Sequence, residues 1–164
     1  MKRSLSQVML GFMLVALASC GFHLRGAADI PDSLKTMYVQ GVDLNSGLGR
    51  ELRLSLTRNG VDVVTDYQND AAVLTIIENS IERRVLSVGS DAKVSEYELF
   101  GTAKFTIADS QGQLLTEQQE VHASRSLQFD QDQVLGKVEE AQLLREQINQ
   151  QMVQSILTRL SVLK

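Results

Sequence analysis

The chain contains few of the residue types that small proteins use for cross-links or for chemistry. Its 164 residues include one cysteine, one proline, two histidines and no tryptophan. A single cysteine cannot form a disulfide within the chain, so the stability of the fold has to come from packing. Basic residues are also in the minority, with 16 Lys and Arg against 20 Asp and Glu. This balance argues against the basic surface of a nucleic-acid-binding protein.

Sequence signatures of catalysis are missing as well. The chain has no G-x-S-x-G, no H-E-x-x-H, no P-loop and no dinucleotide-binding glycine pattern. We interpret His23 and His122 as ordinary surface or boundary residues. Glu96 and Glu98 share one face of a predicted strand, but they lack the aromatic or basic neighbours that an acid–base pair needs. We therefore predict no catalytic residue, no metal site and no cofactor.

The one cysteine lies in a distinctive segment near the N-terminus. Leu17-Ala18-Ser19-Cys20 follows a basic start and an apolar run from Val8 to Ala18, which is the pattern of a bacterial lipobox. The run is shorter than the roughly 20 residues that a membrane-spanning helix needs, so we expect cleavage before Cys20. Cys20 would then carry diacylglycerol on its sulfur and a further acyl chain, such as palmitate, on its amine. Two or more chains anchor a protein stably to a membrane.

The segments around this cysteine define the expected domain organisation. Gly21, and not Asp, follows the cysteine, which resembles the outer-membrane address of Gram-negative lipoproteins. We predict a cleaved lipoprotein signal peptide over residues 1–19, a lipidated linker over residues 20–32 and a single α+β domain over residues 33–164. The linker holds the only proline, Pro31. The domain is long enough to bury its own core.

The first half of the domain has the pattern of a short strand, a helix and a long strand. Met37–Gln40 predicts a short strand. Leucines four residues apart predict a helix over Leu48–Arg58, with Ser46 as a possible N-cap. Residues 61–64 are a possible further extended piece. From Val73 the apolar period changes to two, which predicts a strand with these residues on one face: Val73, Ile77, Ile81 and Val85.

Two more long strands follow in the pattern. Gly89–Lys93 has the composition of a hairpin turn. A turn at residues 109–112 then leads to a fourth strand over Leu114–Phe129. We expect these strands to form an antiparallel meander, with the first strand parallel to the long second one. The strand after the hairpin turn places an apolar set on a common face: Tyr97, Leu99, Ala103, Phe105 and Ile107.

The last element is predicted as an amphipathic helix from Val134 to Leu163, with Asp130 or Asp132 as its cap. Apolar residues recur in it every three or four positions, and Leu144 is expected to be fully buried. The predicted fold is α+β, with a four-stranded, mostly antiparallel (mixed) sheet and two helices packed on one face.

The basic residues are brought together by this topology. A meander returns the end of the fourth strand to the beginning of the third, so the hairpin turn and the start of the last helix lie at the same end of the sheet. Lys93, Lys137, Arg125 and the pair Arg83–Arg84 would converge there. Such a cluster suits phosphate groups, which Arg binds with two hydrogen bonds and Lys binds as a point charge. The alternative, that these are scattered solvated charges, stays open at this point.

Several segments together resemble one family. The chain resembles the LptE family of lipopolysaccharide-assembly lipoproteins over nearly all of the mature sequence, and the cysteine segment is the most specific match. The terminal amphipathic helix belongs to the resemblance but is generic. The matching segments are Cys20-Gly21-Phe22-His23-Leu24-Arg25, Arg58-Asn59-Gly60-Val61, Val94-Ser95-Glu96-Tyr97 and Arg125-Ser126.

The resemblance implies a function. In this family the lipoprotein sits inside the lumen of a large outer-membrane β-barrel, the LptD-like subunit of the lipopolysaccharide translocon, helps that barrel assemble and binds lipopolysaccharide. It implies a non-enzymatic protein that is lipid-anchored in the outer membrane through Cys20, on the periplasmic side or within the barrel lumen. The family's ligand contacts match Lys93 and Lys137, and the expected binding set also includes Arg84 and Arg125.

Two other functions remain as alternatives. One is an independent lipid-anchored module that binds peptidoglycan or free lipid, and the other is a hydrolase with an unfamiliar site. Co-purification distinguishes them, because a plug is isolated with a barrel in a fixed ratio, a module is isolated alone and an enzyme turns over a substrate.

Overall fold

The structure of the protein, a computed structural model, describes residues 29–163 apart from 69, 90–92 and 129–133. The expected signal peptide, Cys20, His23 and the cap candidates Asp130 and Asp132 lie outside the described residues. The side chain of Lys137 is also outside them, although the helix backbone there is described. No helix in the described part of the chain has the length and apolar content needed to cross a membrane.

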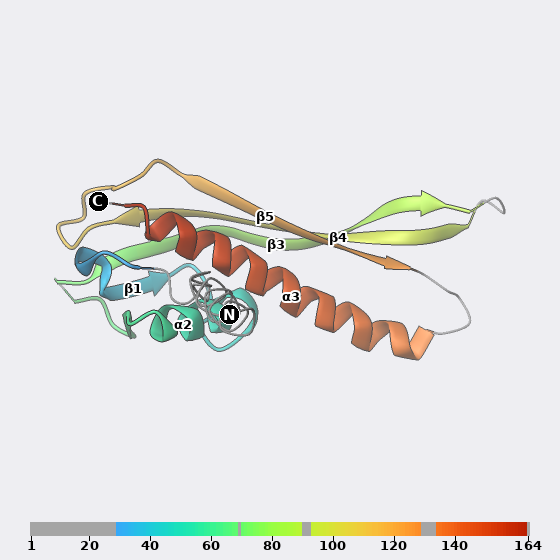
Figure 1. The fold of residues 1–164 in the computed structure, drawn as a ribbon, viewed down its shortest axis with the longest axis horizontal. Helices are drawn as coiled ribbons and strands as arrows, with labels where there is room; N and C mark the ends of the chain where they lie inside the picture. The colour runs from blue at the N-terminus through green and yellow to red at the C-terminus, as the bar shows by residue number, and fades with distance from the viewer. Residues whose placement is uncertain (1–28, 69, 90–92, 129–133, 164) are drawn as a thin grey trace, which may run out of the picture.

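A five-stranded sheet forms one layer of the molecule, and two helices pack against it (Figure 1). The strand order is β2-β1-β3-β4-β5. β1 runs parallel to β2 and β3, while β3, β4 and β5 form an antiparallel meander. In chain order the elements are the 3-10 turn η1 (Asp32–Leu34), β1 (Thr36–Gln40), α2 (Gly47–Arg58), β2 (Asp62–Val64), β3 (Ala72–Val88), β4 (Val94–Ala108), β5 (Gln119–Gln128) and α3 (Val134–Leu160).

The expected α+β fold with a mixed sheet and two helices is confirmed, but the expected number of four strands was wrong. The additional strand is β2, which pairs with β1 at the edge of the sheet. It has three residues, too few to display the period of two by which a strand is recognised. The backbone N–H of Asp62 donates to the carbonyl of Lys35 at 2.7 Å and fixes the start of β2.

A polar turn before α2 determines how this helix begins. Ser46 has the extended N-cap conformation, as expected, but its hydroxyl donates to the carboxylate of Asp43 at 2.7 Å and makes no cap hydrogen bond. The other oxygen of Asp43 accepts the backbone N–H of Asn45 at 2.9 Å. These two hydrogen bonds, the backbone one foremost, keep the pKa of Asp43 below its ordinary value. α2 then buries leucines spaced four apart, Leu48, Leu52 and Leu56.

The apolar face expected for β3 was wrong in its first half. Leu74 and Ile76 are buried there, whereas Ile77 is 52% exposed. The pairing of β3 with β4 shifts between Ile76 and Glu78, which places one extra residue in β3. An extra residue in one strand moves all later side chains to the opposite face. From Asn79 to Val85 the odd-numbered residues of β3 therefore lie on the helix side.

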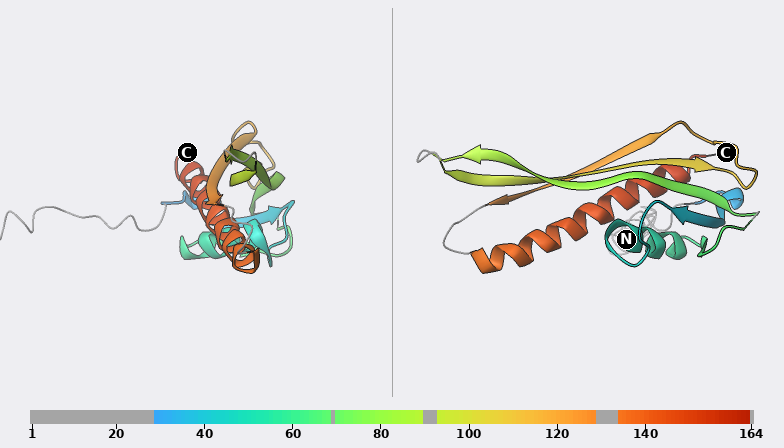
Figure 2. Two further views of the ribbon diagram at one scale, coloured as in Figure 1. Left: turned by 90° about the vertical axis from the view of Figure 1, so that its right-hand side faces the viewer. Right: turned by 180° about the vertical axis from the view of Figure 1, so that it is seen from behind.

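The core occupies only one end of this elongated molecule. β3 and β4 extend well beyond β1 and α2, and α3 runs obliquely beneath them (Figures 1 and 2). Val138, in the first half of α3, is 65% exposed. Leu144 is half-buried, so its expected complete burial was wrong. The core residues of α3 begin further along the helix: Ile148, Met152, Val153, Ile156, Leu157 and Leu160.

Candidate functional site

The four expected basic residues come from the hairpin turn, β3, β5 and α3. Lys93 is exposed next to the first residue of β4, and its carbonyl accepts the N–H of Gly89 at 2.7 Å, which closes the hairpin. Lys137 lies in the first turn of α3. Arg84 and Arg125 lie within β3 and β5, so they stand back from the hairpin end.

Strand register separates two of these residues. Arg84 pairs with Glu98 of β4, and Glu98 pairs with Ser126 of β5. Arg125 pairs with Leu99, which is buried on the helix side of the sheet. Because neighbouring residues of a strand point to opposite faces, Arg84 lies on the outer face, away from α3. The structure therefore does not bring Arg84 and Arg125 together, contrary to the expected convergence.

Arg84 is engaged on the outer face by an acid and an aromatic ring. Its Nη2 and Nε donate to Oε2 of Glu82 at 3.0 and 3.3 Å. The guanidinium carbon also lies 4.0 Å from the centroid of the Phe100 ring. Phe100 in turn lies 5.3 Å from the ring of His122, centroid to centroid. The charge of Arg84 is thus balanced locally by Glu82.

Arg83 lies on the helix side instead, and pattern reasoning did not select it individually. It pairs with Leu99, the same residue with which Arg125 pairs from the other side. Its guanidinium carbon lies 4.6 Å from the centroid of the Tyr97 ring. The signal that could have identified it is the expected apolar face of β3, because residue 83 lies between Ile81 and Val85 on that face.

Arg125 binds neutral acceptors between β5 and α3. Its Nε donates to Oε1 of Gln147 at 3.2 Å, and its Nη1 donates to Oε1 of Gln151 at 2.6 Å and to the carbonyl of Ser124 at 2.7 Å. These amide and carbonyl groups hold the side chain in place without neutralising its charge. A second link between the same elements runs from Nη1 of Arg159 to Oε1 of Gln119.

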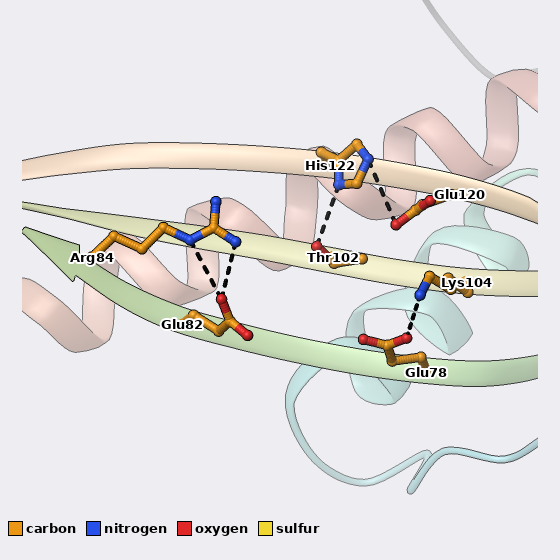
Figure 3. A network of polar contacts seen from close by, with 7 residues as sticks. All are labelled: Glu78, Glu82, Arg84, Thr102, Lys104, Glu120 and His122. Atoms are coloured by element: carbon orange, nitrogen blue, oxygen red, sulfur yellow. Dashed lines mark hydrogen bonds and ion pairs between the residues drawn. The ribbon is translucent and has the colours of Figure 1, made fainter. Parts of the chain in front are cut away.

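The outer face of β3, β4 and β5 is a polar surface with paired charges (Figure 3). Lys104 Nζ donates to Glu78 at 2.6 Å, and this hydrogen bond raises the pKa of Lys104 above its ordinary value. His122 contacts Oγ1 of Thr102 at 3.3 Å through Nδ1, and its Nε2 lies 3.8 Å from Oε1 of Glu120. His122 is exposed, as its interpretation as a surface residue predicted.

Aliphatic side chains are exposed near the hairpin end. Val85 is 55% exposed, and it pairs with Tyr97 on the helix side of the sheet. Leu86 and Val88 are also more than half exposed. Basic groups and aliphatic surface therefore lie within a few residues of each other on this half of the molecule.

The described residues contain no group of three or more His, Cys, Asp or Glu side chains that could hold a metal ion. Glu96 and Glu98 are half-buried on the same face of β4, where Glu98 pairs with Arg84 and Ser126. This arrangement suits electrostatic contacts across the sheet.

Comparison with known proteins places the chain among bacterial lipoproteins. The family model LptE, described as lipopolysaccharide-assembly, matches residues 34–160. The LPS-assembly lipoprotein LptE of Photorhabdus laumondii is 33% identical over 99 residues, which span 60% of this chain and about half (54%) of that protein. The protein of the same name from Pectobacterium atrosepticum is 26% identical over 166 residues, covering 98% of this chain and 86% of that protein.

A solved structure supports the same grouping. A minor lipoprotein from Acinetobacter baumannii matches with a TM-score of 0.67 and 30% identity, covering 80% of this chain and 93% of the other. Fold and relatives together define an envelope lipoprotein with an α+β domain. The chain belongs to the LptE family of lipopolysaccharide-assembly lipoproteins, whose model spans every strand and both helices described above.

Proposed function

We propose that this protein is a non-enzymatic, lipid-anchored outer-membrane lipoprotein that plugs the β-barrel translocon for lipopolysaccharide, helps that barrel assemble and binds lipopolysaccharide. The match of the family model to residues 34–160 carries the proposal, since it covers the whole described fold. The curated relatives are named for the same assembly process. Cys20 is the proposed lipidation site, at the end of the lipobox.

The polar outer face supports a position inside a barrel. The lumen of an outer-membrane barrel is polar. The outer face of the sheet offers paired charges and hydrogen-bonding groups to such a wall, including the Lys104–Glu78 and Arg84–Glu82 ion pairs. Exposed pairs of this kind contribute little to the stability of the isolated domain.

Basic groups on the hairpin half of the molecule support lipopolysaccharide binding. Of the four contacts expected from the sequence, Lys93, Lys137 and Arg125 are the proposed ones, because the charge of Arg84 is already balanced by Glu82. Arginine can bind a phosphate group with two parallel hydrogen bonds, and lysine binds it as a point charge. Because Arg84 and Arg125 lie on opposite faces, a ligand bound to one face contacts only one of them.

Titration with lipopolysaccharide tests this part of the function. The lipidated chain, purified in a mild detergent, is titrated with fluorescent lipopolysaccharide and with the same molecule after enzymatic removal of its phosphates. We expect saturable binding that weakens about 10-fold without the phosphates, because charge-assisted hydrogen bonds are lost. Equal affinity for the two forms, or no binding, would contradict the proposed role of the basic groups.

A further inference from the structure

Arg83 and Arg84 are neighbours in β3 but have opposite electrostatic surroundings. Arg84 shares Oε2 of Glu82 through two nitrogens on the outer face. An anionic ligand that approaches Arg84 has to compete with this carboxylate and is repelled by its charge. Arg83 has no hydrogen bond or ion pair to an acidic side chain within the described part of the chain.

The contact that Arg83 does make leaves its hydrogen-bonding edge available. Its guanidinium carbon lies 4.6 Å from the centroid of the Tyr97 ring. A guanidinium that contacts an aromatic face keeps its charge, and its N–H donors lie in the plane of the group. The planar fork can therefore bind a phosphate with two parallel hydrogen bonds while Tyr97 restricts its orientation.

A second cation lies in register with Arg83 on the same face. Arg83 and Arg125 both pair with Leu99, one from each side of β4. Their backbones are thus two strand spacings apart, about 10 Å. The hydrogen bonds of Arg125 use Nε and Nη1, and all three acceptors are neutral. Its Nη2 therefore keeps two N–H donors, and its charge is balanced by no acid that the structure describes.

Apolar surface adjoins this cation pair. Val85 lies two residues after Arg83 on the same face, pairs with Tyr97 and is more than half exposed. A pair of cations beside exposed aliphatic and aromatic side chains matches the chemistry of a phosphorylated lipid, which carries anionic groups next to hydrocarbon. A ligand with phosphates alone would not use Val85.

We propose that Arg83 and Arg125, on the helix side of the sheet, bind the phosphate groups of lipopolysaccharide, with Val85 against its hydrocarbon, and that Arg84 is not a ligand contact. This assignment rests on the proposed function, because it names the face and the residues of the same binding activity. It replaces Arg84 with Arg83 in the expected set of contacts.

The two neighbouring arginines supply a matched pair of variants. Arg83→Gln and Arg84→Gln each remove one exposed charge from adjacent positions of the same strand. Titration of the lipidated chain with fluorescent lipopolysaccharide should show about a 10-fold loss of affinity for Arg83→Gln and less than a two-fold loss for Arg84→Gln. Arg83→Lys should recover part of the loss, because the charge returns without the planar fork.

Two further readouts separate ligand contact from a structural effect. With dephosphorylated lipopolysaccharide, the difference between Arg83→Gln and the wild type should disappear, and both variants should melt within a few degrees of the wild type. The assignment is overturned if Arg84→Gln weakens binding as much as Arg83→Gln, or if Arg83→Gln binds normally. If the wild type itself binds no lipopolysaccharide, the proposed function fails together with the assignment, whereas normal binding by Arg83→Gln leaves the function intact.

Discussion

Gly101 of β4 lies against Ile148 of α3, so close that a Cβ at residue 101 would come within 2.4 Å of Cγ2 of Ile148. Sδ of Met152 would be 3.1 Å from the same Cβ. The helix therefore packs closely against β4 at a position where the strand has no side chain. Beyond this crossing, toward the hairpin, α3 leaves Val138 exposed.

Substitution of Gly101 tests this crossing. We expect Gly101→Ala to lower the free energy of unfolding by about 1–3 kcal/mol, because the added methyl group overpacks the contact. Ile148→Ala in the same chain removes the clashing Cγ2, so the double variant should lose less stability than the two single variants together. Urea unfolding followed by circular dichroism measures all three.

Thr102→Val is the matched control, since Thr102 is the next residue and lies on the outer face. Its effect should be within about 0.5 kcal/mol, as for most surface substitutions. If the losses in free energy of unfolding from the substitutions at Gly101 and Ile148 were strictly additive, the two residues would not be in contact. The helix α3 would then not lie where the structure places it.

Stability at acid pH should depend on Asp43. Its pKa is lowered from its ordinary value in the folded protein by the backbone N–H of Asn45 and then by the hydroxyl of Ser46. A lowered folded pKa adds stability above the unfolded pKa, and this stability is lost as the pH falls through the folded value. Asp43→Asn should therefore be less stable than the wild type at pH 7, and the two should converge below pH 3.8. If the difference in stability between Asp43→Asn and the wild type persisted unchanged at lower pH, it would not arise from the ionised carboxylate of Asp43.

The sequence patterns predicted the longer elements of this fold, in which apolar residues recur at regular intervals. The face of β4 with Leu99 and Phe105, the leucine spacing of α2 and the parallel pairing of β1 with β3 all follow from period and topology. β2 was expected only as a possible extended piece over residues 61–64 and not as a strand of the sheet, because three residues show no period. One bulge at Ile77 was enough to reverse the expected face of β3 in its first half.

The candidate site was predicted at the level of charge but not of geometry. The meander topology predicted that Arg84 and Arg125 lie in the same region of the sheet, but the strand register places them on opposite faces. Which of two adjacent arginines faces α3 depends on strand phase, and the acid that neutralises Arg84 is two residues away on its own strand. The spacing of β3 was consistent with both facts, but the convergence of basic residues was argued without regard to the faces of the strand.

The lysines at the hairpin end should contribute to ligand binding. We expect Lys93→Asp combined with Lys137→Asp to weaken lipopolysaccharide binding by about 10-fold or more, because two charge-assisted phosphate contacts are lost and reversed. The fold should persist, as circular dichroism will show, since Lys93 is exposed and Lys137 lies in the first turn of α3. Unchanged affinity for lipopolysaccharide in the folded double variant would show that these two lysines do not contact the ligand.

Cys20 should be essential for the anchor and dispensable for the fold. Cys20→Ala removes the sulfur that we propose accepts diacylglycerol, so the precursor should stay unprocessed and unacylated. All the core residues follow Cys20 by ten positions or more, beginning with Ile30, so thermal melting of the domain should be unchanged. Mass spectrometry of the wild-type N-terminus is the direct check. An unmodified Cys20, or cleavage at another position, would exclude lipidation at this residue.

Co-purification tests the central claim, that this lipoprotein acts as the plug of a translocon. The full chain with a C-terminal tag is extracted from the envelope of its own cells in a mild detergent, then isolated by affinity and size-exclusion chromatography. The proposed function predicts co-elution with an outer-membrane β-barrel several times larger than the chain, in a fixed ratio that survives the Arg83→Gln substitution. A folded, acylated protein that elutes alone would contradict it and would favour an independent envelope-binding module.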